Sequence, residues 1–386
     1  MAWLKFSSTP RMGWHKSLLP LVALACIGLA GSSSAARAQP GLVSPPPFEC
    51  APGEWSGKAG RGESFASGHA EPATLAAPSL TVADIFQAGI DEAGRELGKE
   101  RRLTPQQRQA RAEFVFGNML FVTAHELGHA LVSELDLMVL GREEDVADAY
   151  ATVGVLKCGA DFSRRVLVEA TKGWFLTAQR DRKTGEVPQY YERHGLDEQR
   201  AYQIVCLMVG SDPVRFKDLA DEAGLPEGRR RSCGWDYDTA SRSWERALAP
   251  HQRAAGQPKP RIEVIYGEAK GKLALYANIF RATRFLETVM EQVADRFAWP
   301  APIVVEMRSC GEPNARWTIP TRTLHVCYEL AQEFVELYRD FGGDRSLAQL
   351  RLTPAKRPTV RPQNIAQSIG AWKRLHGSQP ARVVVR

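Results

Sequence analysis

Apolar residues recur every three to four positions along much of the chain after Leu80, which is the spacing that one face of a helix requires. Helices are predicted over residues 82–100, 105–135, 143–157, 163–180, 197–209, 272–297 and 328–339. Strands are predicted at residues 262–266, 303–307 and 323–326, and the charged stretch 222–260 is predicted to be irregular. We therefore expect an α+β fold, in which a mainly helical lobe precedes a small α/β lobe with an antiparallel sheet.

The predicted helix at residues 105–135 is apolar on nearly every side through its second half, as a buried helix is. Within residues 114–132 the ionisable side chains are His125, Glu126 and His129. Leaving such groups buried without partners costs roughly a few kcal/mol each. Histidines four positions apart project from one helix face and can bind one zinc ion, Zn2+. Glu126 then lies beside the open coordination position, where a general base is needed.

A catalytic zinc ion usually has a third protein ligand and keeps one position for water. The metzincin pattern would place glycine and histidine three and six positions after His129. Val132 and Leu135 occupy those two positions, so this class of site is excluded. The third ligand must come from elsewhere in the chain.

The next predicted helix opens with three acidic residues, a feature that also suits the dipole of any helix N-terminus. Glu144 stands four positions before Asp148, so the two carboxylates share a helix face. We predict Glu144 as the third ligand and Asp148 as the carboxylate that orients a zinc-bound imidazole. Glu143 and Asp145 remain the alternatives for the ligand.

The pattern His125-Glu126-x-x-His129 followed by Glu144-x-x-x-Asp148 resembles that of the gluzincin peptidases. The amino-acid sequence around these residues is more similar to a bacterial family of metallopeptidases defined by a domain of unknown function. The stretches that carry this resemblance are residues 125–131, 140–151, 194–200, 206–213, 310–317 and 327–330. The resemblance covers most of residues 110–340. It implies a zincin-like helical lobe, a zinc ion and hydrolysis of peptide bonds.

Peptide hydrolysis also needs a donor for the negative charge that develops on the scissile carbonyl oxygen. His194 is the first candidate, because its stretch resembles the family and Asp197 lies close enough in sequence to orient it. Tyr202 and Tyr150 are further candidates, and an ordinary loop histidine remains the alternative for His194.

The segment Asn314-Ala315 resembles the edge strand with which zinc peptidases of this type bind extended substrate. In those peptidases the strand precedes the zinc helix, whereas here it follows. Either the chain is permuted relative to them or the match is accidental. A permutation is physically easy where termini lie at the surface.

The two ends of the chain differ from its body. Residues 1–38 have a basic start, an apolar core and an A-x-A sequence before Gln39, which predicts a signal peptide; an uncleaved anchor is the alternative. We expect a flexible leader at 39–78, the helical zinc-binding lobe at 79–255, the α/β lobe at 256–345 and a basic tail at 346–386. The protein is expected to be exported, to the periplasm or beyond the cell.

The formal charge of +6 is concentrated at the ends. Residues 1–38 hold four basic residues and residues 351–386 hold eight, with no acidic residue in either, which leaves −6 for the remainder. The tail could touch an anionic membrane or be a solvated extension. The body lacks the basic and aromatic interleaving of nucleic-acid-binding proteins. A peptide or protein substrate is the expected partner.

Six of the seven cysteines follow the predicted signal peptide, and an even number in an exported chain favours disulfides. Cys310–Cys327 flanks a predicted hairpin and is the first pair expected. Cys206–Cys233 is the second, and Cys50–Cys158 follows by elimination. No C-x-x-C spacing indicates a structural zinc site instead.

These observations predict an exported zinc metallopeptidase of gluzincin type. A catalytically silent, zinc-stabilised binding protein of the cell envelope is the alternative, and the intact Glu126 argues against it. A helical protein without metal is disfavoured by the spacing of Glu144 and Asp148.

Overall fold

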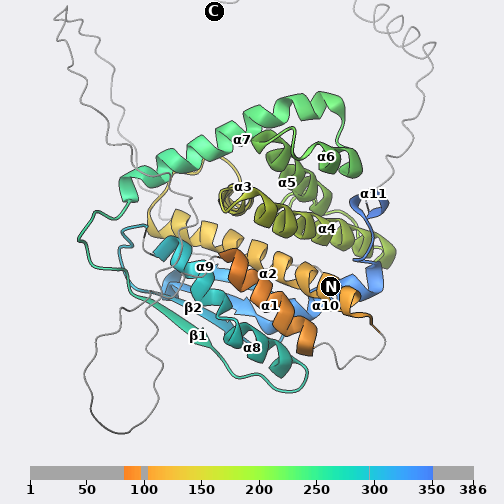
Figure 1. Cartoon of the computed structure of the whole chain (residues 1–386). Helices are drawn as coiled ribbons and strands as arrows, with labels where there is room; N and C mark the ends of the chain where they lie inside the picture. The colour runs from red at the N-terminus through yellow and green to blue at the C-terminus, as the bar shows by residue number, and fades with distance from the viewer. Residues whose placement is uncertain (1–81, 97–102, 295, 351–386) are drawn as a thin grey trace, which may run out of the picture. The chain divides into compact units, whose positions relative to one another are not determined.

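The computed structural model describes residues 82–96, 103–294 and 296–350 (Figure 1). The described helices are α1 (Val82–Glu96), α2 (Pro105–Glu134), α3 (Glu143–Leu156), α4 (Ala160–Thr184), α5 (Asp197–Ser211), α6 (Lys217–Ala223), α7 (Glu227–Leu248), α8 (Leu273–Ala282), α9 (Phe285–Ala294), α10 (Tyr328–Phe341) and α11 (Leu347–Leu350). The strands are β1 (Ile262–Tyr266), β2 (Ile303–Arg308), β3 (Ala315–Thr318) and β4 (Thr323–Cys327). Short 3₁₀ turns occupy Ala249–His251 and Ile319–Thr321.

Helix α2 lies between α3, α4 and α5 on one side and the sheet with α1 and α10 on the other (Figure 1). A capping box at its start explains why the helix begins where it does. The Thr104 hydroxyl accepts a hydrogen bond from the Gln107 N–H, the Gln107 side chain accepts one from the Thr104 N–H, and Pro105 occupies the first helical position. From Phe114 onward almost every side chain is buried, because elements pack on both sides.

The sheet has the order β1-β2-β4-β3. Strands β1, β2 and β4 are parallel neighbours, and β3 pairs antiparallel with β4 at one edge. The predicted α+β class is confirmed. The expectation of an antiparallel sheet is wrong for two of the three strand pairs, because β1–β2 and β2–β4 are parallel and only β3–β4 is antiparallel in the described sheet. Residues 303–307 and 323–326 were expected to form a hairpin, but β3 lies between them in sequence and takes the antiparallel place, which leaves β2 and β4 parallel.

Two predicted stretches differ from the structure. Residues 222–260 were expected to be irregular, yet α7 covers 22 of them. Its sequence is mostly polar, and few of its residues are buried, among them Cys233 and Trp244. The predicted helix at 272–297 is two helices, α8 and α9, because Arg284 adopts a left-handed conformation with φ 51° between them.

The predicted disulfides Cys206–Cys233 and Cys310–Cys327 are both present. The first joins α5 to α7, and the second joins the end of β4 to the loop before β3. Disulfides fit an extracellular protein. Cys158 is disulfide-bonded as well, and its predicted partner Cys50 lies outside the described residues.

Several predictions concern residues that the structure does not describe. The signal peptide at 1–38, the leader at 39–78 and nearly all of the tail lie outside the described ranges. The proposed lobe boundaries remain predictions. Within the ranges that are described, no helix combines the length and the apolar character needed to cross a membrane.

Candidate metal centre

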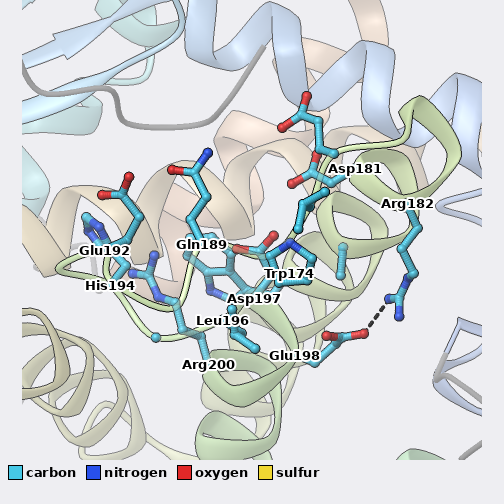
Figure 2. A pocket seen from close by; sticks show the side chains of 15 residues that line it. Trp174, Asp181, Arg182, Gln189, Glu192, His194, Leu196, Asp197, Glu198 and Arg200 are labelled. Atoms are coloured by element: carbon cyan, nitrogen blue, oxygen red, sulfur yellow. Dashed lines mark hydrogen bonds and ion pairs between the residues drawn. The ribbon is translucent and has the colours of Figure 1, made fainter.

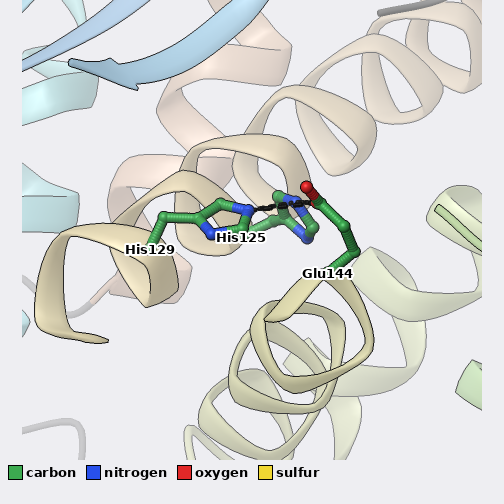
Figure 3. A group of neighbouring side chains, drawn as sticks. All are labelled: His125, His129 and Glu144. Carbon is green, nitrogen blue, oxygen red and sulfur yellow. Dashed lines mark hydrogen bonds and ion pairs between the residues drawn. The ribbon is translucent and has the colours of Figure 1, made fainter. Parts of the chain in front are cut away.

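Helices α2 and α3 bring His125, His129 and Glu144 to one point (Figure 3). The Nε2 atoms of the two histidines are 3.2 Å apart. Glu144 Oε2 lies 3.3 Å from Nε2 of His125 and 3.1 Å from Nε2 of His129. Tetrahedral zinc with bonds of about 2.0–2.1 Å holds neighbouring ligand atoms about 3.3 Å apart. The three atoms therefore have the spacing that one tetrahedral metal ion requires.

A buried chain of charges supports His125. Its Nδ1 donates to Asp148 Oδ1 at 2.7 Å, which leaves Nε2 free for a metal. Arg200 from α5 clamps the same carboxylate through two hydrogen bonds of 2.7 Å, and its guanidinium stacks 3.7 Å from the Trp174 ring centre. Burial alone would raise the pKa of Asp148, but Arg200 and His125 hold it well below its usual range. Asp148 is therefore ionised, and it fixes the tautomer and orientation of His125.

The second histidine has a carboxylate of its own. Glu143 Oε1 accepts a hydrogen bond from His129 Nδ1 at 2.6 Å. The three acids at the start of α3 therefore have different positions. Glu144 joins the metal group, Glu143 orients His129, and the exposed Asp145 pairs with Arg142. Sequence reasoning proposed Glu143 only as an alternative ligand, and it found no role for Arg200.

Glu126 lies between the metal group and the edge strand. It is 3% exposed, and its Oε2 accepts a hydrogen bond from the main-chain N–H of Trp317 at 2.9 Å. Burial raises the pKa of Glu126, while the neighbouring histidines and this N–H lower it. The indole N–H of Trp317 also donates to Ser133 Oγ at 2.7 Å. Strand β3 is thus attached to α2 at two points.

His194 reaches the metal group from the loop between α4 and α5. Its Nε2 lies 2.7 Å from Glu144 Oε2. It does not belong to the group whose ligand atoms all lie within 4.8 Å of one another. Burial lowers the pKa of His194, although Glu144 opposes the shift. No hydrogen bond joins it to Asp197 among the described residues.

The two tyrosines that were further candidates pack against aromatic side chains. The Tyr150 ring lies 4.8 Å from the ring of Trp244, and the Tyr202 ring lies 5.3 Å from that of Phe175. Tyr150 is buried and Tyr202 is partly buried.

The edge strand offers main-chain groups beside Glu126. The Asn314 carbonyl accepts a hydrogen bond from the Cys327 N–H of β4 at 3.0 Å. Alternate residues of a strand point their main-chain groups to the same edge, so Asn314 and Arg316 face β4, whereas Ala315 and Trp317 face away from it. No described strand pairs with that second edge. Asn314 is 5% exposed, and its Oδ1 has no hydrogen-bond partner within the described residues.

A second group of potential ligands is fully engaged in other bonds. It consists of Cys310, Cys327 and Glu329. The two sulfur atoms form a disulfide, and the Glu329 carboxylate accepts hydrogen bonds from the N–H groups of Cys310 and Gly311. These residues hold the loop before β3 and leave no thiolate for a metal.

The chain matches a known protein family over more than half of its length. The model of the family described as "putative metallopeptidase" matches residues 90–248 and 268–353, which together are more than half of the chain. The chain belongs to this family. The matched ranges contain the metal group, its supporting carboxylates and the edge strand. Neither a curated protein nor a solved structure matches the chain.

Proposed function

We propose that this family member is an exported zinc peptidase of gluzincin type. His125, His129 and Glu144 would hold the ion, which lowers the pKa of a bound water molecule and polarises the scissile carbonyl. Two histidines and one carboxylate are the donor set of known catalytic zinc sites, and three protein ligands leave a position for water. The observation that carries the proposal is the buried Glu126, held between this group and an unpaired strand edge.

Glu126 acts as the general base and then as the acid. Its carboxylate accepts a proton from the attacking water and delivers it to the leaving amine. The Trp317 N–H holds Oε2 in place, so the carboxylate needs no reorganisation before the reaction. The raised pKa of Glu126 favours this role, because a carboxylate with a low pKa is a weak base and takes a proton from water poorly.

Substrate binds to the free edge of β3 in extended form. The main-chain groups of Ala315 face that edge and can form hydrogen bonds with a peptide backbone, which makes recognition largely independent of sequence there. Oδ1 of Asn314, which has no hydrogen-bond partner among the described residues, is a further acceptor for a substrate N–H. The contact of Trp317 with Glu126 supports the edge-strand assignment from sequence, although this strand follows the zinc helix in the chain.

His194 donates a hydrogen bond to the negative charge that develops on the carbonyl oxygen. Its position beside Glu144 but outside the ligand group supports this role. Export is supported by the disulfides and by the predicted signal peptide.

The test compares Glu126→Gln with the wild type and with Glu113→Gln, a matched change on the same helix that lies away from the metal group. Elemental analysis should show about one zinc per chain in all three proteins. Hydrolysis of a diverse peptide library should fall by about 10²- to 10⁴-fold in Glu126→Gln only. A zinc-loaded wild type that cleaves no peptide would contradict the proposal and favour a silent binding protein.

A further inference from the structure

Two cavities lie beside the metal group, and they differ in size and chemistry. The smaller has a volume of about 20 Å³ and touches His125, Glu126 and Ala315. Its remaining wall is mostly apolar and comes from Phe121, Val122, Trp174 and Leu330, with Arg200 completing it. Because it adjoins both the proposed base and the strand edge, a side chain next to the cleaved bond would enter it.

The larger cavity has a volume of about 180 Å³ and lies beside His194 (Figure 2). Carboxylates of the α4 end and the α5 start line it, including Asp181, Asp197 and Glu198. Trp174 and Arg200 belong to the walls of both cavities. The indole of Trp174 is therefore part of the partition between a small apolar space and a large polar one.

The partition is rigid for a physical reason. Trp174 is 8% exposed, and the Arg200 guanidinium lies 3.7 Å from its ring centre. Arg200 is in turn fixed by its two hydrogen bonds to Asp148. To swing aside, the indole would have to break its stacking on a cation that supports the metal group.

A space of this size holds one small group. A cavity that admits a single water molecule offers about 10–15 Å³ on the same measure, and a methyl group is similar in size. A leucine side chain needs room for four carbons, so a space that admits little more than one water molecule favours a smaller group. The surface that the cavity exposes is mostly apolar, and the Arg200 guanidinium is already bound to Asp148, so a charged side chain would lose hydration on entering.

We propose that Trp174 makes this protein selective for peptides in which one residue flanking the cleaved bond is small, such as alanine or glycine. This inference rests on the proposed function and names its substrate class. Removing the indole joins the small cavity to the large one and admits leucine or phenylalanine at the same position.

The experiment measures binding separately from catalysis. Dipeptide hydroxamates that differ only in the residue beside the hydroxamate (glycine, alanine, leucine or phenylalanine) are titrated calorimetrically into zinc-loaded protein. In the wild type the alanine compound should bind about tenfold or more tightly than the leucine and phenylalanine compounds. Trp174→Ala should reverse this order. Val122→Ala, a milder change in the same wall, should bring the leucine compound closer to the alanine compound.

Trp235→Ala removes an exposed indole on α7 and should leave the order of the four compounds unchanged. Wild-type protein that binds the leucine compound as tightly as the alanine compound overturns the inference. So does a folded Val122→Ala protein with wild-type selectivity. If none of the four compounds binds, the metal site and the proposed function fail together. Cleavage of large-residue peptides by a protein that passes the Glu126 test would overturn the inference alone.

Discussion

The side of the site formed by α3 and the side formed by β3 are built differently. On the α3 side, each histidine has a carboxylate on Nδ1, and Asp148 is clamped by Arg200. On the β3 side, the polar groups are mainly main-chain groups, and several of them face an edge with which no described strand pairs. Satisfied polar networks make a site rigid, whereas unpaired groups are available to a ligand. Under the proposed function, the α3 side would hold the ion and the β3 side would bind the peptide.

The largest expected effect comes from removing a ligand on the α3 side. Glu144→Ala leaves two histidines and no carboxylate ligand, so zinc affinity should fall by more than about 10³-fold. Glu143→Ala removes only the partner of His129 and should cost about 10- to 100-fold. Competition with a fluorescent zinc chelator measures both affinities. If the two variants bound zinc equally well, Glu144 would not be the ligand.

Breaking the charge chain behind His125 should have the next largest effect. Arg200→Leu leaves the buried Asp148 without its cation and should lower the free energy of unfolding by about 3 kcal/mol. Arg193→Leu is the matched control. Its exposed guanidinium lies 3.4 Å from Glu144 Oε1, so its loss should cost less than about 1 kcal/mol. Urea unfolding curves of the zinc-free proteins give both values. Equal losses would show that Arg200 is no more important than a surface charge.

The smallest effect is expected from a change on the β3 side. In Cys310→Ser/Cys327→Ser the loop before β3 loses its covalent link to β4. The KM for a peptide should rise by about tenfold, since a looser edge loses part of its preorganisation. Zinc affinity should stay within about twofold, because α2 and α3 are untouched. The matched control Cys206→Ser/Cys233→Ser loosens α5 and α7 and should raise KM less, because neither helix contributes to the β3 edge. A fall in zinc affinity with constant KM would reverse the roles assigned to the two sides.

The bounds of helix α2 could be predicted almost to the residue, because residues close together in the sequence determine both its start and its burial. Thr104 and Pro105 mark the start, and the apolar run marks the buried part. Helix α7 could not be predicted in the same way. Its sequence is polar, and it is held by the Cys206–Cys233 bond and by the Trp244 indole, which donates to the Val146 carbonyl at 3.2 Å. These contacts depend on residues far away in the sequence.

The candidate site also contains residues that a local sequence pattern predicts and residues that it does not. The group of His125, His129 and Glu144 follows from spacing on two helices, and so does the place of Asp148. The partnership of Glu143 with His129 depends on how α2 and α3 approach each other, which spacing does not specify. Arg200 comes from a third helix. Its stretch was noticed only through the family resemblance, and no local pattern reveals that it clamps Asp148.

The late position of β3 in the chain has a consequence for biosynthesis. Synthesis proceeds from the N-terminus, and domains begin to fold in that order. The metal group and its charge chain are complete once residue 200 has emerged, more than a hundred residues before Trp317. Until Trp317 has emerged, Glu126 lacks its main-chain donor and the β3 edge is missing. The order of the chain therefore separates completion of the metal group from completion of the β3 edge. Under the proposed function, an unfinished molecule would bind its ion before it could bind or cut a peptide.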